Sequence, residues 1–326
     1  MPHPKRFLAA LGMLVAVCLC NAAWAQYPER ALRLVVPYAA GGGTDAFSRL
    51  VAEMLGRELK QSVVVENRGG AGAIVGTQAV ASAPADGYTL LIATNGNMVV
   101  TPLVYSKLNY DVKRDFKVLA ILGEAPTVVV VNPSVPAKNL REFGAYIKAN
   151  PSKANFASLG QGNALYIATR ILEADLGLAM SEIPYKGSAP ALTALMAGDV
   201  PMFVDLASTS IPLAKAGKVR PLAVPHRQRL PWFPDVPTFA EEGLTPLHAP
   251  SWMGLAFSSG VPPAAIAAVQ AAARKVAADP RLKTYMDNAG MVPVTDADDM
   301  AGAEKYLDAD RERWGAAVKR FKIKLD

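Results

Sequence analysis

The segment at residues 37–45, PYAAGGGTD, has the clearest potential for binding chemistry in this 326-residue chain. Its three glycines allow a tight turn that presents backbone N–H groups. A helical pattern follows, and the first turn of a helix adds unpaired N–H groups and the positive end of the helix dipole. A carboxylate or phosphate fits such a loop. The segment alone fits equally well a tight turn in which Thr44 caps the helix. It is not a P-loop, since no Gly-Lys-Ser/Thr follows.

Two segments in the second half of the chain repeat this arrangement. Residues 158–163 (SLGQGN) and 185–188 (YKGS) each follow a strand-like run and precede a helical pattern, so each offers another helix N-terminus to an anion. Lys186 either pairs with a charged ligand or lies on the surface, as lysines commonly do. Asn95 ends a third strand, at the edge where open α/β sheets bind ligands. Asp205 ends an apolar run, where it either hydrogen-bonds a ligand or ordered water or caps the next helix.

Residues 70–76, GAGAIVG, loosely match the glycine pattern of dinucleotide-binding loops. The spacing differs by one residue from G-x-G-x-x-G, and matches of this kind are weak. We therefore interpret the segment as a turn that allows close helix packing, and we expect no nucleotide cofactor.

Residues suited to catalysis are sparse. Beyond the N-terminal region the histidines are His226 and His248, in a proline-rich stretch, and both cysteines, Cys18 and Cys20, lie near the N-terminus. The sequence has no G-x-S-x-G elbow, no H-E-x-x-H motif and no Asp/Glu cluster at metal-ligand spacing. We expect neither a metal nor another cofactor, and we expect that the protein is not an enzyme. The alternative is a periplasmic hydrolase or isomerase that uses Asp45 or Asp205 as its general base.

The N-terminus has the pattern of a secretory signal peptide. Lys5 and Arg6 precede an apolar run at residues 7–20, and Ala23-Trp24-Ala25 supplies the small residues that signal peptidase requires. We predict cleavage after Ala25 and a periplasmic location. The run is short for a membrane span, so an N-terminal anchor is the less favoured interpretation. A lipid anchor is disfavoured too, because Val17 and Leu19 precede the cysteines.

Apolar β-rich runs alternate with helical patterns along the whole chain, which predicts α/β units with mostly parallel sheets. In the first half we expect strands at 32–37, 62–66 and 89–94 and helices at 44–59 and 72–82. After a β-rich stretch at 118–131 the pattern restarts, with a helix that Asn139 and Glu142 open as a capping box. Further strands are expected at 155–158, 181–184, 201–205, 219–224 and 252–258, and helices at 163–176, 188–197, from Pro262 onward and around Leu307 to Phe321.

This order suggests two domains with a cleft between them, because a late strand and helices would pack back onto the first unit. We predict a signal peptide at 1–25, a first domain from 26–125 and 246–326, and a second domain at 126–245. The net charge is +6, and the basic residues are scattered. Nucleic acid is therefore not an expected partner. A small positive excess fits an anionic ligand without proving one.

Several of these segments, in this order, resemble the Bug-type receptors, which are the periplasmic solute-binding proteins of the tripartite tricarboxylate transporter family. The resemblance covers essentially all of the chain after the signal peptide. The segments that carry it are LVVPYAAGGGTDAFSRLVA (34–52), VVVENRGGAGAIVGTQAVA (63–81), ADGYTLLIATNGN (85–97), VVNPSVPAKNL (130–140), YKGSAPALTALMAGDVPMFVD (185–205), AGKVRPLAV (216–224) and FPDVPTFAEEGL (233–244).

The resemblance implies a two-domain periplasmic-binding-protein (Venus-flytrap) fold that holds a carboxylate in the cleft through backbone amides and water. Ligands of the family include dicarboxylates, tricarboxylates, amino acids and aromatic acids. The implied partners are this small carboxylate and the subunits of a membrane transporter, or a sensor protein in a sensor-only receptor, and we expect a monomer. Transferred to this chain, the ligand-binding residues are Tyr38, Ala39, Gly42, Gly43, Thr44, Asp45, Asn95, Ser158, Gln161, Gly162, Asn163, Tyr185, Lys186, Gly187, Ser188 and Asp205.

The chain departs from many relatives at residues 98–102 (MVVTP) and at Leu206, and the loop at 159–163 is also unusual. These positions are expected near the far end of the ligand. The lower polarity of residues 98–100 and of Leu206 suggests a less polar ligand, such as an aromatic or longer-chain acid.

Overall fold

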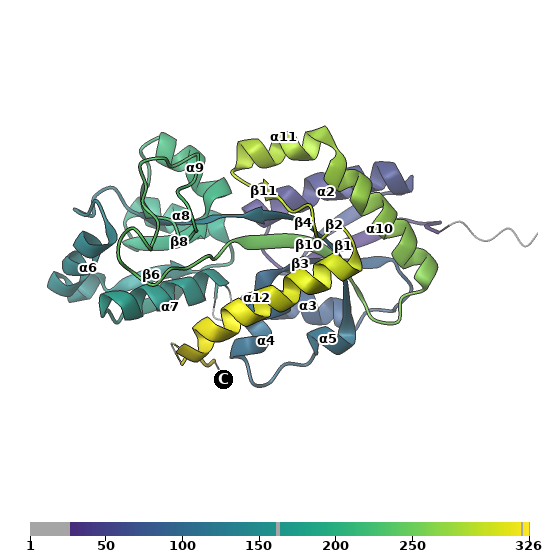
Figure 1. The fold of residues 1–326 in the computed structure, drawn as a ribbon, viewed down its shortest axis with the longest axis horizontal. Helices are drawn as coiled ribbons and strands as arrows, with labels where there is room; N and C mark the ends of the chain where they lie inside the picture. Colours follow the sequence, from purple (N-terminus) through teal and green to yellow (C-terminus); the bar gives the residue numbers. More distant parts are fainter. Residues whose placement is uncertain (1–26, 161–163, 321, 326) are drawn as a thin grey trace, which may run out of the picture.

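Two mixed β-sheets, each covered by helices, form the two lobes of the molecule (Figure 1). The computed structural model describes residues 27–160, 164–320 and 322–325. The predicted signal peptide at 1–25 therefore lies outside the described residues. Among the residues described, no helix is long and apolar enough to cross a membrane.

The first lobe combines strands from both ends of the chain. Its sheet has the order β11-β4-β10-β3-β1-β2, so the late strand β10 lies between two early ones. The strands are β1 (Leu32–Val36), β2 (Val63–Asn67), β3 (Thr89–Thr94), β4 (Phe116–Ala125), β10 (Ser251–Ser258) and β11 (Val292–Pro293). The helices are η1 (Ala71–Ala73), α2 (Gly43–Leu59), α3 (Ile74–Ala81), η2 (Gly96–Val100), α4 (Thr101–Val104), α5 (Val112–Asp115), α10 (Pro263–Ala278), α11 (Pro280–Ala289) and α12 (Met300–Arg320).

The second lobe is built from a continuous middle part of the chain. Its sheet has the order β7-β6-β8-β5-β9. The strands are β5 (Thr127–Val131), β6 (Asn155–Ser158), β7 (Ser181–Pro184), β8 (Met202–Leu206) and β9 (Arg220–Ala223). The helices are α6 (Leu140–Ala149), η3 (Pro151–Lys153), α7 (Ala164–Leu176), α8 (Ser188–Ala197) and α9 (Ala207–Lys215).

The prediction of mostly parallel sheets is wrong. β1 pairs in parallel with β2 and β3, and β6 with β7 and β8, but β10 is antiparallel to β3 and β4, and β5 is antiparallel to β8 and β9. The reason is that β4 and β5 run from one lobe into the other, and β10 brings the chain back. A strand that crosses between lobes need not follow a helix, so it can enter a sheet in either direction.

Local sequence accounts for several elements. The side-chain oxygen of Asn139 accepts a hydrogen bond from the backbone nitrogen of Glu142 at 2.8 Å, so the predicted N-cap of α6 is confirmed. In α2 the apolar face is buried, with Phe47, Val51 and Leu55 wholly inaccessible to solvent. That burial holds α2 on its sheet and fixes the position of its N-terminus.

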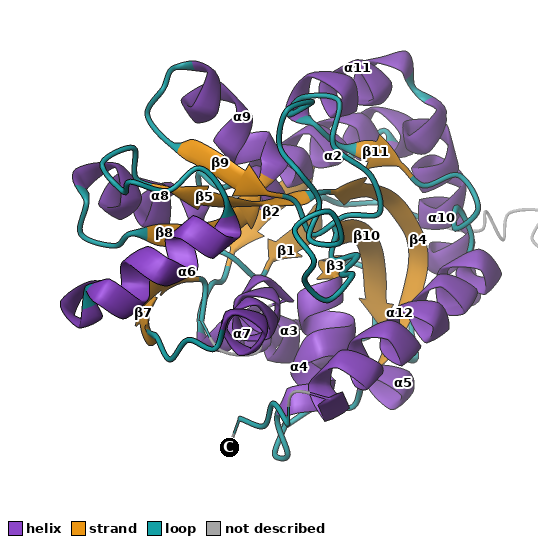
Figure 2. Cartoon of the chain, turned by 60° about the vertical axis from the view of Figure 1, so that its left-hand side comes forward, coloured by secondary structure: helices purple, strands orange, loops and turns teal. Residues whose placement is uncertain are grey.

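The chain passes between the lobes at Pro126 and again just before β10. The two crossings lie next to each other, because Ala125 at the end of β4 pairs with Ser251 at the start of β10, and Figure 2 shows these strands side by side. The hydroxyl of Thr127 donates to the carbonyl of Ala249 at 3.0 Å. The amide of Asn95 donates to the carbonyl of Pro250 at 2.9 Å. These bonds tie the two connections to each other and to the first sheet, next to the space between the lobes. The exact boundaries at 125/126 and 245/246 stay predictions.

Candidate functional site

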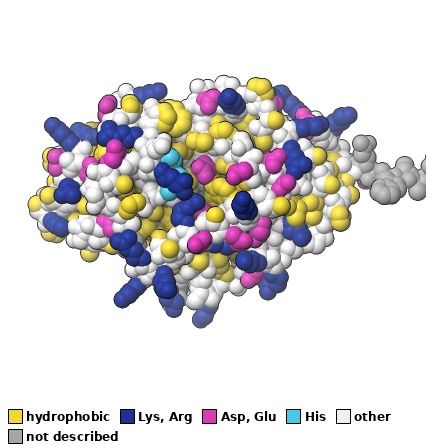
Figure 3. Space-filling view, viewed as in Figure 1, with side chains coloured by type: hydrophobic (Ala, Val, Ile, Leu, Met, Phe, Trp, Pro, Cys, Tyr) yellow, Lys and Arg dark blue, Asp and Glu magenta, His cyan; other side chains and the backbone are white. Residues whose placement is uncertain are grey.

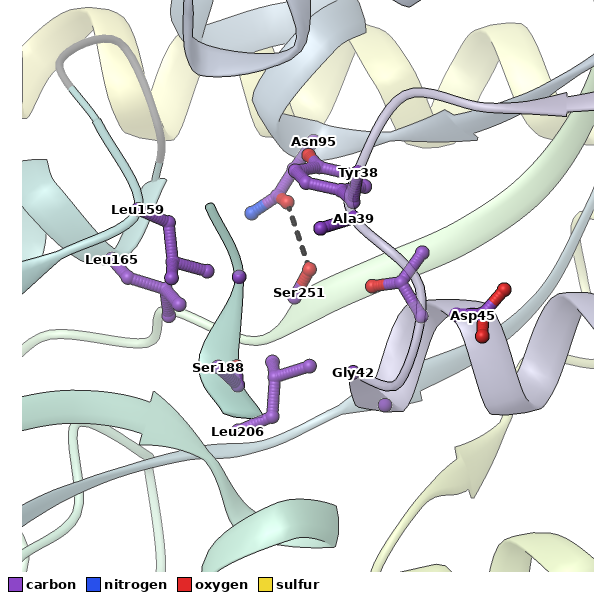
Figure 4. A pocket seen from close by; sticks show the side chains of 13 residues that line it. Tyr38, Ala39, Gly42, Asp45, Asn95, Leu159, Leu165, Ser188, Leu206 and Ser251 are labelled. Carbon is purple, nitrogen blue, oxygen red and sulfur yellow. Dashed lines mark hydrogen bonds between the residues drawn. The ribbon is translucent and has the colours of Figure 1, made fainter. Parts of the chain in front are cut away.

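A cavity of about 30 Å³ lies between the lobes, where the glycine-rich loop after β1 faces the start of α8 (Figure 4). Nine of the predicted binding residues line this cavity, which we call the cleft cavity. They are Tyr38, Ala39, Gly42, Gly43, Thr44, Asp45, Asn95, Gly187 and Ser188. Loops more than 140 residues apart in sequence therefore meet at one site.

The N-termini of two helices, one from each lobe, meet at the cleft cavity. Gly42 is the N-cap of α2 and Gly187 is the N-cap of α8, and neither end has a side-chain cap. A Cβ placed on Gly42 would lie 3.9 Å from the backbone nitrogen of Ser188. The first N–H groups of each helix have no acceptor within their own helix. The cavity thus receives backbone donors and the positive ends of two helix dipoles from opposite sides.

Asp45 holds the loop rather than facing the cavity. Its carboxylate accepts hydrogen bonds from the backbone nitrogen of Gly41 (2.9 Å), from Arg49 (3.1 Å) and from Asn67 (2.9 Å). Figure 4 shows the carboxylate turned away from the other labelled residues. Burial acts to raise the pKa of Asp45, but these donors outweigh it and the pKa lies below its ordinary value. The side chain predicted to bind ligand therefore keeps the turn in shape.

Asp205 is fully buried near the end of β8, and the next residue, Leu206, lines the cleft cavity. One carboxylate oxygen accepts from the hydroxyls of Thr209 (2.6 Å) and Ser210 (2.8 Å), while the other oxygen accepts no hydrogen bond. Burial raises its pKa, and the nearby hydroxyls, including that of Ser188, reduce the rise only in part. Asp205 does not cap the next helix, because the N-cap of α9 is Leu206 and no side chain caps it. The Asp205 carboxylate instead binds hydroxyl groups in the first turn of α9, and a hydrogen bond to a ligand stays a prediction.

Asn95 and Tyr38 line the cleft cavity with their polar groups already engaged. Ser251 donates to the Asn95 side-chain oxygen at 3.2 Å, and the Asn95 amide is bonded to the second crossing. The hydroxyls of Tyr38 and Thr94 are 2.9 Å apart, and burial raises the pKa of Tyr38 to about 12. Both side chains shape a wall of the cavity and fix it relative to the crossings.

The remaining predicted residues lie elsewhere. Ser158 is buried and its hydroxyl accepts from the backbone nitrogen of Gly160 at 2.9 Å, so it shapes a turn. Tyr185 and Lys186 line a neighbouring cavity instead. Gln161, Gly162 and Asn163 lie outside the described residues.

Comparison with known proteins decides the family. A family model described as tripartite tricarboxylate transporter family receptor matches residues 47–323.

The chain belongs to this receptor family.

Solved structures agree with this assignment. The periplasmic binding protein BugD is 30% identical, has a TM-score of 0.87 and aligns over 91% of this chain and 99% of its own. MatC from Rhodopseudomonas palustris, with bound malate, is 30% identical with a TM-score of 0.85, covering 90% and 100% of the two chains. R. palustris Rpa4515 with adipate is 29% identical with a TM-score of 0.85, covering 91% and 99%. The predicted resemblance and the two-domain binding-protein fold are confirmed.

Four residues of the receptor's cleft cavity were not among the predicted binding residues. These are Leu159, Leu165, Leu206 and Ser251. The sequence analysis named Leu206 only as a position at which this chain departs from many relatives. Leu206 lines the cleft cavity. No local sequence pattern marks Leu165 or Ser251 as a binding residue. Leu165 lies in the first turn of α7 and Ser251 begins β10, and only the packing of the lobes brings them to the cavity.

The expected role of residues 98–100 is wrong. Met98, Val99 and Val100 are at most 1% exposed and belong to the core of the first lobe. They form most of η2, a π-helical turn that follows β3, and this turn directs them inward. Their low polarity reflects packing, and it says nothing about the ligand.

The described part of the receptor offers little for metal or acid–base chemistry. It contains no group of three or more His, Cys, Asp or Glu side chains arranged to hold a metal ion. His226 and His248 pack against each other with ring centroids 4.7 Å apart, and burial is the main cause that lowers the pKa of His248 to about 3. On the face shown in Figure 3, basic and acidic side chains are interspersed. This face therefore has no basic patch of the kind that binds nucleic acid.

Proposed function

We propose that this receptor captures a small carboxylate in the cleft cavity, in the periplasm, and presents it to membrane transporter subunits. The observation that carries the proposal is the pair of opposed helix N-termini, α2 and α8, in one cavity. Malate and adipate in the solved relatives are both carboxylates, which supports the same ligand class here. We further propose that residues 1–25 direct export and are removed after Ala25.

Backbone groups can supply the affinity without a basic side chain. Among the described residues that line the cleft cavity, Asp45 is the one with a charge, and its carboxylate is occupied by Gly41, Arg49 and Asn67. A hydrogen bond to a charged acceptor contributes roughly 1.5–3 kcal/mol, and a helix dipole adds about 0.3–1 kcal/mol. Three to five such bonds, less the cost of association, are enough for a dissociation constant near 1 μM, which corresponds to about −8.2 kcal/mol.

Binding would couple to closure because the donors come from different lobes. The described arrangement is compact at this point: a Cβ on Gly43 would meet the side chains of Ser208 at 2.8 Å and Leu206 at 3.4 Å. A carboxylate that touches both helix ends prefers this closed arrangement, and that preference shifts the population of states. We propose that the transporter recognises the closed form.

The proposal includes no catalysis. The Asp45 carboxylate is engaged by three donors, and Asp205 is fully buried. Both observations support a structural role for these carboxylates rather than a role as general base.

The decisive experiment measures thermal unfolding of residues 26–326 with a panel of carboxylates, followed by calorimetry. The panel contains malate, adipate, citrate, glutamate, nicotinate and benzoate. At 100 times its dissociation constant, a ligand adds about 2.7 kcal/mol to the free energy of unfolding. The matched control is the amide of each hit, which has the same size but no charge and should not bind. Stabilisation by the amide equal to that by the acid would contradict the proposal.

A further inference from the structure

Asp205 is a buried carboxyl group beside the cleft cavity, and the first lobe helps to cover it. It is wholly inaccessible to solvent, whereas Leu206 next to it lines the cleft cavity. A Cβ placed on Gly43, the first residue of α2, would lie 2.8 Å from the Ser208 hydroxyl and 3.6 Å from the methyl group of Thr209. Thr209 is also a donor to the Asp205 carboxylate. The start of α2 thus packs on the turn around Asp205, and this cover is removed when the lobes separate.

The hydrogen bonds of Asp205 compensate its charge only in part. One carboxylate oxygen accepts from Thr209 at 2.6 Å and from Ser210 at 2.8 Å, while the other oxygen accepts no hydrogen bond. A buried carboxylate with an oxygen in this state is costly, and protonation removes the cost. The pKa of Asp205 is raised by burial, in agreement with this geometry.

The elements packed against Asp205 bring few charges to it. The strands β5 and β6 and the helix α8 have no ionisable side chain. The charged groups on the other facing elements are Lys215 at the far end of α9, about 9 Å along the helix from Thr209, the ion pair of Arg170 and Glu173 in α7, Asp175 in α7, Lys186 before α8, and Asp45 with Arg49 in α2. Asp175 is engaged by Thr245, and Lys186 lines the neighbouring cavity. A carboxylate bound in the cleft cavity therefore adds the decisive negative charge near Asp205.

Ser188 connects Asp205 to the cleft cavity. It lines the cavity, and its hydroxyl is near enough to Asp205 to counteract the rise in the pKa of that residue. A serine hydroxyl has one proton to donate. While Asp205 is charged, it competes with a ligand carboxylate for this proton and also repels the ligand. Once Asp205 is protonated, its own O–H can donate to Ser188, and the Ser188 hydroxyl is released to donate to the ligand.

We propose that the receptor captures a proton together with its carboxylate ligand: Asp205 takes up one proton from solvent as the lobes close and returns it to solvent as they open. This inference rests on the proposed function, because the ligand must be an anion that reaches the start of α8. Lobe closure and the ligand's charge both disfavour the ionised form of Asp205, so ligand and proton each promote the binding of the other. Affinity is therefore higher at lower pH, in a range where the ligand itself stays ionised.

The first test is calorimetry of the mature protein with malate and with benzoate at three pH values between 6.5 and 8. Each titration is made in MOPS and in imidazole, which release different heats on ionisation, so the difference in heat counts the protons taken up. Carboxylic acids are almost fully ionised in this range. We expect uptake of up to one proton, with affinity falling by up to tenfold per pH unit where uptake occurs. Binding without proton uptake at all three pH values would overturn the inference.

The second test removes the titrating group. Asp205→Asn should bind malate or benzoate without proton uptake and with an affinity that no longer depends on pH. The matched control is Glu173→Gln in α7, because Glu173 is also buried in the second lobe and has a raised pKa, but it does not line the cleft cavity. Its glutamine retains an acceptor for the backbone nitrogen of Met180. E173Q should take up as many protons as the unaltered protein, and the same uptake by D205N would contradict the role of Asp205.

A third variant keeps the inference testable if Asp205→Asn does not fold, which circular dichroism would show. Thr209→Val removes one hydroxyl donor from the charged form of Asp205, so proton uptake should occur at higher pH than in the unaltered protein. Uptake over an unchanged pH range would overturn the inference. Failure of malate, benzoate and every other acid of the panel to bind the unaltered protein would instead overturn the proposed function.

Discussion

The two lobes each place an aspartate beside a helix N-terminus at the cleft, yet the two carboxylates are in opposite states. Asp45 in the first lobe is held by a backbone N–H, an amide and a guanidinium, and its pKa is lowered. Asp205 in the second lobe has hydroxyl donors on one oxygen and none on the other, and its pKa is raised.

The difference shows that similar sequence positions can perform different tasks. The first carboxylate organises a loop that would otherwise be an unsupported run of glycines, and it stays charged while doing so. The second is a buried group whose charge is poorly compensated, and burial of such a charge is costly. We therefore expect the first lobe to carry the rigid half of the site, and the second lobe to be sensitive to protonation.

The largest expected effect comes from Asp45→Ala. Removal of this carboxylate leaves the backbone N–H of Gly41 without its acceptor and takes one acceptor each from Arg49 and Asn67, so we expect a loss of about 3 kcal/mol in the free energy of unfolding. Urea denaturation measures the loss, and ligand calorimetry should show binding weakened at least a hundredfold. A control is Asp86→Ala, which removes an exposed carboxylate paired with Arg30 at 2.7 Å and should cost under about 1 kcal/mol. Equal losses for the two variants would refute the organising role of Asp45.

Gly43→Ala tests the contact between the lobes. The added methyl group would meet Ser208 and Leu206 in the closed form, so we expect ligand affinity to fall about tenfold by calorimetry. The first lobe should stay folded, because alanine is the better helix former. The control, Gly315→Ala in α12, has its nearest neighbour 4.0 Å away and should leave affinity unchanged. Unchanged affinity in Gly43→Ala would mean that ligand capture does not need this closed contact.

Thr44→Ala and Ser188→Ala compare the anion-binding ends of the two lobes directly. Both positions line the cleft cavity in the first turn of their helices. If both hydroxyls add to the backbone donors at their helix ends, each loss should weaken binding by a similar factor, roughly fivefold, or about 1 kcal/mol. Ser188→Ala also removes a donor to Asp205, so the free energy of unfolding is measured for both variants. Calorimetry on the two variants decides the point. If only Thr44→Ala lost affinity, the carboxylate would be bound by the first lobe alone.

The smallest effect is expected for Asp205→Asn at acid pH, where the Asp205 carboxyl group is protonated; the asparagine retains an acceptor for Thr209 and Ser210. Under those conditions the free energy of unfolding should change by less than about 1 kcal/mol. A raised pKa means that the stability Asp205 contributes is fully present below its ordinary value of 3.8 and is lost as pH rises through the folded pKa. Urea denaturation between pH 3.5 and 8 should therefore show that the free energy of unfolding of Asp205→Asn increases relative to that of the unaltered protein as pH rises.

Asp45 should respond in the opposite direction. Its pKa is lowered, so its contribution is present above 3.8 and is lost as pH falls through the folded pKa. If the free energies of unfolding of Asp45→Ala and Asp205→Asn changed with pH in the same way, the proposed difference between the two aspartates would be wrong.

The sequence predicted more of the scaffold than of the side-chain roles. The elements around Gly42 and Ser188 could be found because periodicity and glycine loops are local signals, and the family resemblance placed them at one cleft. The direction of the Asp45 side chain could not be predicted, because it depends on Asn67, 22 residues away. The prediction of mostly parallel sheets was wrong because strand direction also depends on distant parts of the chain. The direction of β10 is set by the second crossing between the lobes. The inward turn of Met98 follows from a π-helical turn without a clear sequence signature.

The position of β10 also sets the order in which the molecule can be assembled. This strand lies in the middle of the first sheet, yet it begins at Ser251, which follows the whole second lobe in the sequence. The second sheet takes all its strands from residues 127–223 and can form from that stretch alone. The first sheet must wait for β10, and closing a loop of more than 150 residues between β3 and β10 is entropically slow. Until then β3 and β4 present unpaired edges, so this early half is the part of the chain that a chaperone would have to protect.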